Sequence, residues 1–412
     1  MSSRLRADAL MVLRIAVADL RRVFLHLQGL SDAPSRRLGQ AELCDLIDRL
    51  GFVQVDSINT VTRAHHQILF SRNQTYRETQ LTRLLERDRA LFENWTHDAA
   101  VIPSSAFPYW RHRFARQKER LKARWTNWQG HDFHDEIERV RDHVRANGPS
   151  RGRDFDGDRV RKEPGWWNWQ PGKTALEYLW RTGEIAVTAR DNFAKIYDLS
   201  ERVIPREHFE QEVALEDFVD WACREALQRL GVGTSGEIAA FYDLVSPEEA
   251  KAWCAQETGK SILPVEIDFG PGQPKRASVA RPDIAALLTE APEPPARIRT
   301  LSPFDPVLRD RKRAERLFGF FYRIEVFVPA PKRTYGYYVY PVMEKDRMIG
   351  RVDMICRRAE GELLVTAFWP EPGVRLGEGR LARLEAEFAR MARFTGMERV
   401  VFADGWRREP SG

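Results

Sequence analysis

The 412-residue sequence lacks the features that mark several common classes of protein. No apolar run approaches the roughly 20 residues that cross a bilayer, and residues 1–22 lack the apolar block and cleavage site of a signal peptide. The four cysteines form no CxxC pair, so neither a zinc ribbon nor a disulfide framework is indicated. We therefore expect a cytoplasmic protein with no membrane partner, no metal and no cofactor.

The composition is that of an ordinary globular protein, with 43% hydrophobic and 30% charged residues and a net charge of +5. The charge is unevenly distributed, because residues 111–124 hold many arginines and lysines and a single acidic residue. Such a helix is often only a solvated face. The imbalance also suits a polyanionic partner such as DNA.

Residues 1–130 are predicted to be helical with one short strand. Apolar residues recur at helical spacing, and Gly51 stops one helix just before the extended stretch 52–56. The expected helices are 10–30, 41–50, 61–72, 77–92 and 109–124.

Two later stretches, 131–208 and 209–289, repeat one order of predicted elements. In each, three helices precede two strands, which is the winged-helix pattern. A Pro-rich linker at 290–298 then leads into β-rich segments that suggest a small barrel or sandwich. The strands of the two repeats are expected at 184–188, 194–198, 264–269 and 275–280. The β-rich segments are expected at 323–328, 336–340, 348–356 and 363–368. A last helix is expected at 380–394 and a last strand at 399–402.

The most informative short motif is Gln54-Val55-Asp56, in the predicted strand of the first stretch. In a strand, residues i and i+2 project to one face about 6.5 to 7 Å apart, and residue i+1 projects to the other. Gln54 and Asp56 can therefore reach one water from the same side while Val55 packs in the core. On these three residues alone, polar side chains at alternating positions are usually just the solvated face of a strand.

The surroundings of this motif resemble a known family. The stretch LGFVQVDSINTVTRAHHQILFSR (Leu50 to Arg72) resembles the catalytic segment of the YcaQ-type crosslink-repair DNA glycosylases. Those enzymes carry Gln-apolar-Asp, or Gln-apolar-Gln in the related azinomycin-resistance branch. Three more blocks resemble the family in the same order: WTHDAAVIP (95–103), LEYLWRTGEIAVTARDNFAKIYDLSERVIP (176–205) and LSPFDPVLRDRKRAERLFGFFYRIEVFVPAPKRTYGYYVYPV (301–342).

The resemblance implies an α+β fold of three tandem winged-helix units that form a concave surface, followed by a small C-terminal β-barrel or sandwich. The implied divisions are 1–130, 131–208, 209–289 and 290–412.

The resemblance also implies that Asp56 is the catalytic carboxylate and Gln54 its partner at the water and the lesion. A purine alkylated at N7 is cationic and leaves as a neutral base. The enzyme must therefore mainly stabilise an oxocarbenium-like sugar and direct water at C1′. No lysine stands beside the motif, so hydrolysis is expected rather than a Schiff-base route.

Several basic and imidazole side chains are expected to contact DNA. His65 and His66 point about 100° apart on a helix, and no carboxylate stands at HExxH spacing, so phosphate contact or a structural role fits better than a metal site. A loop with three tryptophans at 166–169 suits base stacking or a plug between domains. Arg309, Arg313 and Arg316 are expected on one helical face. The residues assigned to DNA contact are Arg63, His65, His66, His97, Arg111, Arg113, Arg116, Lys173, Arg181 and Arg313.

Two other functions fit a winged-helix protein, because fold does not fix function. The chain could be a transcription regulator without catalysis, or a structural DNA-binding protein. The regulator is disfavoured because no separate effector domain is indicated and the Gln-x-Asp segment lies outside any recognition helix. We expect the partner to be double-stranded DNA with alkylated purines, and the protein to act as a monomer.

Overall fold

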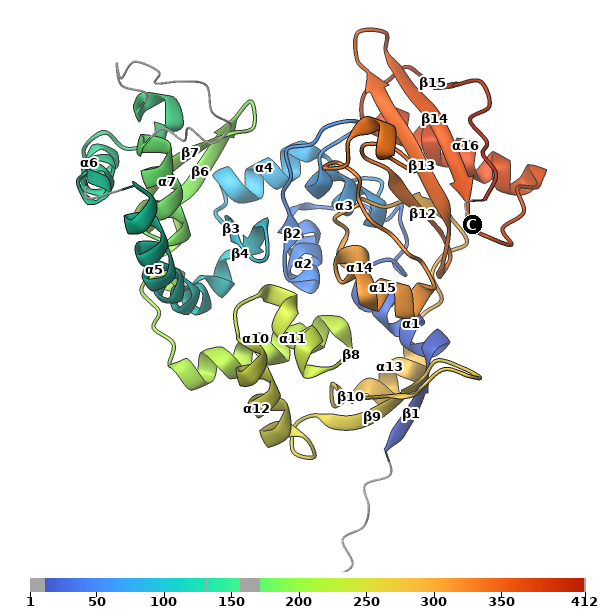
Figure 1. Ribbon diagram of the computed structural model, residues 1–412, viewed down its shortest axis with the longest axis horizontal. Helices are drawn as coiled ribbons and strands as arrows, with labels where there is room; N and C mark the ends of the chain where they lie inside the picture. Colours follow the sequence, from blue (N-terminus) through green and yellow to red (C-terminus); the bar gives the residue numbers. More distant parts are fainter. Residues whose placement is uncertain (1–11, 130–131, 156–170, 411–412) are drawn as a thin grey trace, which may run out of the picture.

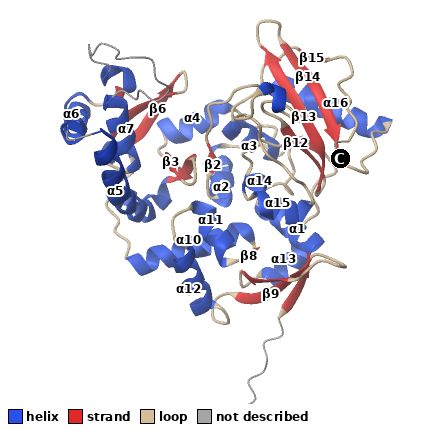
Figure 2. Ribbon diagram, viewed as in Figure 1, coloured by secondary structure: helices blue, strands red, loops and turns tan. Residues whose placement is uncertain are grey.

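The computed structural model describes residues 12–129, 132–155 and 171–410. The start of the predicted N-terminal helix and the tryptophan loop lie outside these ranges. The described residues form a mixed α+β structure with four small sheets (Figures 1 and 2). We call the four predicted divisions the first to fourth segments. The first segment (blue to cyan) lies between the second (green), the third (yellow) and the fourth (orange to red) in Figure 1.

The first segment contains a three-stranded antiparallel sheet, where the sequence predicts a single strand. Strand β4 (Ala99–Pro103) pairs with both β2 (Val53–Gln54) and β3 (Leu91–Trp95). The prediction missed β3 and β4 because both are buried along almost their whole length and lack the alternation of a half-exposed strand. The helices are α1 (Val17–Leu27), α2 (Gln40–Leu50), α3 (Ala64–Arg72), α4 (Glu78–Glu86), the short η1 (Ser104–Ala106) and α5 (Phe107–Gln129).

A strand near the N-terminus joins the sheet of the third segment. Strand β1 (Leu13–Ala16) runs parallel to β9 (Leu263–Asp268), with Leu13 opposite Val265. The predicted helix over 10–30 is therefore wrong for these four residues. Four residues are too few to separate the helical from the strand period, and the partner strand far along the chain decides the outcome.

The second segment follows the predicted order of elements. Its hairpin of β6 (Ile185–Asp191) and β7 (Ala194–Leu199) matches the expected ribbon. Ser150 pairs with Tyr197 in the two-residue strand β5 (Ser150–Arg151), which the sequence did not predict. The helices are α6 (Asp132–Asn147), η2 (Gly152–Phe155), α7 (Pro171–Arg181), α8 (Ser200–Val203) and α9 (Arg206–Phe209).

The third segment also has its predicted helices and strands. Capping boxes start two of the helices, because Thr234 accepts from the backbone of Glu237 and Ser246 accepts from that of Glu249. The helices are α10 (Leu215–Leu230), α11 (Ser235–Tyr242), α12 (Pro247–Glu257) and α13 (Ile284–Glu290), and the sheet order is β1-β9-β10-β8, with β10 at Arg276–Ala280 and β8 at Val232–Gly233.

The fourth segment is an open five-stranded sheet. The sequence predicts a small barrel or sandwich here. Among the described residues no pairing joins the first strand to the last, so the sheet is a half-barrel that stays open. Helix α16 (Glu378–Phe394) covers the apolar face instead, with Leu384, Phe388 and Met391 fully buried. Residues 323–328, expected to be β-rich, form no strand. The strands in order are β11 (Ile298–Thr300), β12 (Tyr340–Glu344), β13 (Arg347–Arg357), β14 (Glu362–Pro370) and β15 (Arg399–Phe402), and the other helices are α14 (Pro306–Arg309), α15 (Arg311–Phe318) and η3 (Ala330–Lys332).

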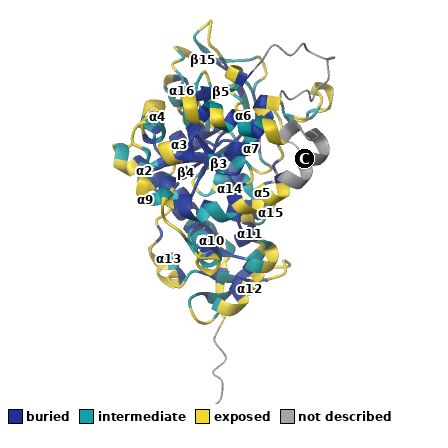
Figure 3. Cartoon of the chain, turned by 90° about the vertical axis from the view of Figure 1, so that its left-hand side faces the viewer, coloured by how far each residue is buried: buried dark blue, intermediate teal, exposed yellow. Residues whose placement is uncertain are grey.

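Two hydrophobic cores meet in the first segment. One core joins α1 and β4 to the third segment through residues such as Phe24, Phe52 and Phe241. The other joins α2 and α3 to the sheet of the fourth segment through residues such as Ile68 and Phe368. Figure 3 accordingly shows buried residues gathered around α3, β3 and β4. Strand β2 is thus held by the rest of the molecule from more than one side.

Candidate active site

Strand β2 carries Gln54 because the chain turns sharply after α2. Gly51 ends that helix with φ +83°, a conformation that side chains disfavour. A Cβ there would lie 2.5 Å from the hydroxyl of Tyr242 and 2.7 Å from Nε of Arg229. Gln54 then pairs with Ala100 of β4. A glycine at this turn therefore lets the third segment pack directly against the start of the stretch that carries Gln54 and Asp56.

The Gln54 side chain is buried, with 3% of its surface exposed, and is bonded at both ends of its amide. Its Nε2 donates to Oδ2 of Asp98 at 3.3 Å, and its Oε1 lies 3.1 Å from Nε2 of His97. A glutamine amide has two N–H donors and two acceptor positions. The two bonds orient the amide and leave one donor and one acceptor position for a water.

His97 lies in the turn between β3 and β4 and contacts Arg309 on its other side. The Nε of Arg309, at the end of α14, is 2.8 Å from Nδ1 of His97. Burial lowers the pKa of His97 to about 3, and three nearby arginines add to the effect. The imidazole is therefore neutral at physiological pH. His97, expected to contact phosphate, instead lies between an arginine and the Gln54 amide.

Asp56 follows β2 and is half-buried. Its Oδ1 accepts a hydrogen bond of 2.8 Å from the backbone N–H of Ile58, the arrangement of an Asx turn. Burial raises the pKa of Asp56 above its ordinary value, the N–H of Ile58 opposes this, and the charge of Asp98 adds to it. Two carboxyl groups and one amide thus gather at the end of β2.

The other predicted histidines lie elsewhere. His65 and His66 on α3 line a cavity of about 230 Å³. Arg63, just before α3, and Phe193, in the turn of the β6–β7 hairpin, also line it. Val55 also lines it, whereas Gln54 and Asp56 do not. His66 bonds the hydroxyl of Tyr76 at 2.8 Å, and the ring of Phe193 stacks on His65. Both imidazoles are buried, so we do not expect either to contact a phosphate.

Arg63 also faces this cavity rather than the Gln54 amide. Its guanidinium lies 4.3 Å from the centre of the Phe193 ring. Burial lowers its pKa, while the charge of Glu78 opposes that effect. A DNA contact by Arg63 remains a prediction.

Two of the predicted DNA contacts are buried arginines. Arg113 donates to the backbone oxygens of Thr96, at 2.6 Å, and of Asp243. Arg313 lies 3.4 Å from Glu237 and donates to the backbone oxygen of Leu230. These bonds leave neither guanidinium a face for a phosphate.

The expected helical face of Arg309, Arg313 and Arg316 does not form. Asp310 is extended and caps α15, which separates α14 from α15. Arg313 and Arg316 both reach Glu237, while Arg309 turns toward His97. One stretch of basic sequence therefore supplies internal contacts in two directions.

The remaining basic residues lie nearer the surface and stay predicted DNA contacts. Arg116 forms a bidentate pair with Glu249, at 3.0 and 2.6 Å. Arg181 bonds Glu177 and stacks 3.9 Å from the centre of the Trp95 ring. Lys173 is exposed at the start of α7.

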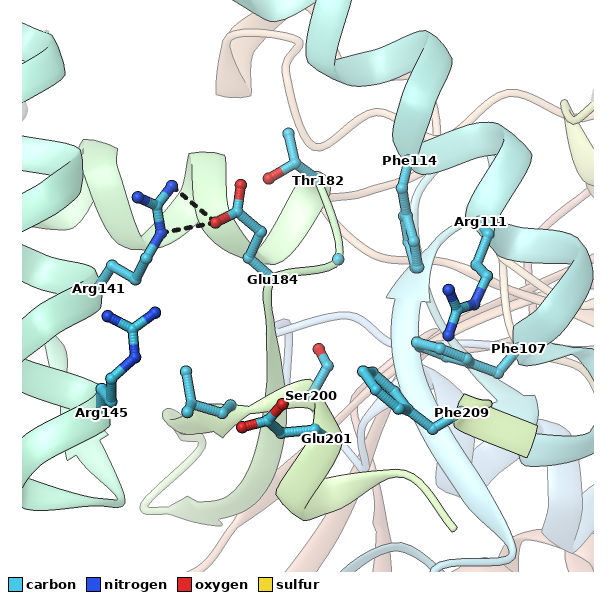
Figure 4. Close-up of a pocket in the computed structure, with 12 residues that line it drawn as sticks. Phe107, Arg111, Phe114, Arg141, Arg145, Thr182, Glu184, Ser200, Glu201 and Phe209 are labelled. Carbon is cyan, nitrogen blue, oxygen red and sulfur yellow. Dashed lines mark hydrogen bonds and ion pairs between the residues drawn. The ribbon is translucent and has the colours of Figure 1, made fainter. Parts of the chain in front are cut away.

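Arg111 lines a larger cavity, of about 430 Å³, between α5 of the first segment and the elements of the second (Figure 4). Its guanidinium packs over the rings of Phe107 and Phe209. Across the cavity, Arg141 bonds Glu184 at 2.7 Å. Neither Gln54 nor Asp56 lines this cavity, so it is separate from the candidate site.

Asp98 and Arg309 are the two site residues that the sequence analysis did not assign to chemistry. Asp98 follows His97 directly, but its approach to Gln54 depends on the β3–β4 hairpin, which was not predicted. Arg309 is more than 200 residues from His97 in the chain, and the bond between them is tertiary. A prediction of the hairpin would have placed Asp98 opposite the end of β2.

The part of the chain that the structure describes has no cluster of three or more His, Cys, Asp or Glu residues arranged to hold a metal ion. Over the same residues, no helix is both long and apolar enough to cross a membrane. The four cysteines are free thiols, and three of them are buried.

A family model described as DNA glycosylase AlkZ-like matches residues 47–394, a range that includes Gln54, Asp56, His97 and Arg309. The fold is similar to that of the Streptomyces sahachiroi DNA glycosylase AlkZ, with a TM-score of 0.64 and 17% identity over 95% of this chain and 100% of that chain. At that identity the likeness shows the fold alone. The family match spans most of the sequence and confirms the resemblance seen there, so the chain belongs to the AlkZ-like DNA glycosylase family.

Proposed function

We propose that this DNA glycosylase hydrolyses the N-glycosidic bond of cationic N7-alkylated purines in double-stranded DNA, including purines in N7-linked interstrand crosslinks. The observation that carries the proposal is the Gln54 amide, held by His97 and Asp98 next to the half-buried carboxylate of Asp56. In this proposal the first three segments are winged-helix units with the predicted boundaries, and the protein acts as a monomer. The glycosylase family favours this reading over a transcription regulator.

The chemistry follows from what each group has to offer. As the C1′–N bond breaks, its electron pair neutralises the cationic purine, so the base needs no strong acid to leave. The Asp56 carboxylate stabilises the positive charge that develops on the sugar. It then accepts a proton from the water that attacks C1′. The free donor and acceptor of Gln54 suit holding that water in line.

Activity on crosslinks is proposed from the chemistry of the lesion. A purine tethered through N7 to the opposite strand cannot rotate out of the duplex without dragging its partner. An enzyme that unhooks it must bring the catalytic strand to the duplex. Strand β2 is only two residues long, and Asp56 lies just beyond its end, half-buried rather than enclosed. A carboxylate in this position could reach a purine that remains stacked in the duplex and does not rotate out of it.

Two substrates test the proposal. A duplex with 7-methylguanine is expected to release free base, and an N7–N7 mustard crosslink is expected to separate into single strands on a denaturing gel. A uracil-containing duplex serves as the control and should remain intact, because uracil is neutral. Absence of 7-methylguanine release would overturn the proposed function. Release of 7-methylguanine without separation of the crosslinked strands would remove only the crosslink part.

A further inference from the structure

We propose that the cavity beside Arg111 (Figure 4) binds a single unpaired nucleotide, with its base against phenylalanine rings and its phosphate on Arg111 and Ser200. The cavity measures about 430 Å³, within the range of roughly 300 to 1,000 Å³ that is typical of small-molecule sites. It is open to solvent, because the exposed residues Arg145 and Glu201 line it. The cavity lies apart from the candidate active site, so this binding does not depend on base release.

Three phenylalanines form one wall of the cavity. The rings of Phe107 and Phe209 are stacked with 5.9 Å between their centres, and the centre of Phe114 lies 5.6 Å from that of Phe107. Phe114 also covers Gly183, in the turn after α7, where φ is +76° and a Cβ would lie 2.2 Å from the ring. A glycine there brings the second segment against this wall. Phe107 and Phe114 are buried, so the half-buried Phe209 presents the most ring surface to a ligand.

The guanidinium of Arg111 lies over the same wall, 5.1 Å from the centre of the Phe209 ring and 6.0 Å from that of Phe107. Among the described residues it forms no ion pair, and its buried Nε has no hydrogen-bond partner. A guanidinium has only donors, and two of them together match the oxygens of a phosphate. Arg111 therefore has donors available for an anion whose flat substituent lies against the phenylalanines.

The hydroxyl of Ser200 is a second polar group without a partner. Ser200 begins α8, and its side chain is buried, yet its Oγ makes no hydrogen bond within the described part of the chain. In Figure 4 this oxygen points into the cavity beside Phe209. Buried polar groups are normally hydrogen-bonded. An unpartnered hydroxyl on a cavity wall therefore suits an oxygen of a bound ligand.

The arginines on the opposite wall are already paired. Arg141 binds Glu184 at 2.7 Å, and Arg145 binds Asp142 at 2.7 Å. Glu201 has no ion pair among the described residues, but it is exposed, so water reduces the effect of its charge on an anion. The free donors of the cavity thus lie at the phenylalanine wall.

These features match the two chemical parts of a nucleotide. Bases stack on aromatic side chains, and guanidinium and hydroxyl groups bind phosphate. In a duplex the faces of a paired base are covered by its neighbours, so a base that lies against Phe209 must be unpaired. The chain belongs to a DNA glycosylase family, so the nucleotide has two possible sources, a free mononucleotide or an unpaired nucleotide of DNA.

The first test is a calorimetric titration of the full-length protein with deoxyguanosine monophosphate, deoxyadenosine monophosphate and inorganic phosphate. The nucleotides are expected to bind about tenfold more tightly than phosphate, because the base adds stacking on Phe209. Both bases should bind, since every base has a flat face to stack.

Anisotropy titrations of labelled DNA separate the two sources. A duplex with a short single-stranded overhang is expected to bind about tenfold more tightly than the blunt duplex. An overhang that gives no gain, together with tight binding of mononucleotides, would assign the site to free nucleotides. If the overhang gives no gain and the mononucleotides bind no better than phosphate, the cavity is an anion site at most and the proposal is wrong.

Two variants test the cavity itself. Arg111→Met and Phe209→Leu keep an apolar side chain, and each is expected to weaken nucleotide binding about tenfold. Arg145→Met is the matched control, because Arg145 lines the same cavity but is exposed and paired with Asp142, so its loss should change affinity less than about twofold.

Equal losses in Arg111→Met and Arg145→Met would assign the effect to general charge and contradict the proposal, as would unchanged binding in Phe209→Leu. The wild-type titrations remain decisive if a variant does not fold. None of these measurements requires base release, so a failure of the proposed function would leave this result standing.

Discussion

The two sides of strand β2 hold histidines that are alike in burial and different in what they contact. Burial lowers the pKa of His97 to about 3 on the side of Gln54, and of His66 to about 3 on the side of Val55. Nε2 of His97 lies 3.1 Å from Oε1 of the Gln54 amide, and the guanidinium of Arg309 lies against the same ring. His65, behind the strand, has an Nδ1 with no hydrogen-bond partner within the described residues.

The difference shows that a strongly shifted pKa does not by itself mark a functional site. All three imidazoles are shifted because water is excluded, which is a consequence of packing. What separates His97 is that it contacts the amide of Gln54, a side chain with spare donor and acceptor positions. Substitutions on one side of β2 at a time test this difference between His97 and the two histidines behind the strand.

The largest effect is expected from Asp56→Asn. Loss of the carboxylate charge should slow 7-methylguanine release by more than about 100-fold, because the sugar cation and the attacking water lose their partner. Affinity for the duplex should hardly change, since phosphate contacts come from elsewhere. Single-turnover rates and a binding titration measure the two quantities.

Gln54→Ala is the comparison variant for this experiment. An amide contributes orientation without a full charge, so its removal is expected to cost less than Asp56→Asn. The reverse order would mean that the two roles are exchanged. Release by Asp56→Asn within about threefold of the wild type would contradict the assignment of Asp56.

The sequence predicted the parts of this site that depend on local pattern. Gln54 lies in a short strand, as predicted, although β2 ends there and Asp56 lies just beyond it. Each of the second and third segments has the predicted helices before its hairpin. It could not predict β1, whose partner β9 is far along the chain, or the contact of Arg309 with His97. It also treated the basic run 309–316 as one face, because it did not detect that Asp310 interrupts the helix. Contacts fixed by tertiary packing leave little trace in local periodicity.

A smaller effect, on pH dependence, is expected from Asp98→Asn. After burial, the charge of Asp98 is the cause that raises the pKa of Asp56. Asparagine removes that charge and keeps an acceptor for Gln54, so the pKa of Asp56 should fall. Because the ionised carboxylate is the active form, activity is lost as pH falls through this pKa. The acid limb of kcat/KM should therefore move to lower pH, by up to about one unit.

Asp243→Asn is the control for this measurement. Its carboxylate pairs with Arg113 at 3.4 Å and is not among the groups that shift Asp56. The acid limb should stay in place in this variant. An acid limb that does not move in Asp98→Asn, or that moves to higher pH, would show that Asp98 and Asp56 do not interact as the structure indicates.

The smallest effect on activity is expected from His65→Phe, on the far side of β2. A phenyl ring keeps the stacking on Phe193 and removes a buried nitrogen that has no partner, so base release should stay within about twofold of wild type. The matched His66→Phe variant leaves the buried hydroxyl of Tyr76 without its hydrogen-bond partner. Its free energy of unfolding should therefore fall by about 1–3 kcal/mol.

The stability of His65→Phe is also expected to depend less on pH than that of the wild type. The folded-state pKa of His65 lies well below 6.5, so below about pH 6.5 the unfolded chain takes up a proton that the folded protein does not. This group therefore makes the wild type less stable as pH falls. Phenylalanine abolishes that proton uptake, so the Tm of His65→Phe should drop less between pH 7 and pH 5 than that of the wild type. A steeper drop, or a loss of base release comparable to that of Gln54→Ala, would mean that the two sides of β2 are coupled and that His65 serves the site.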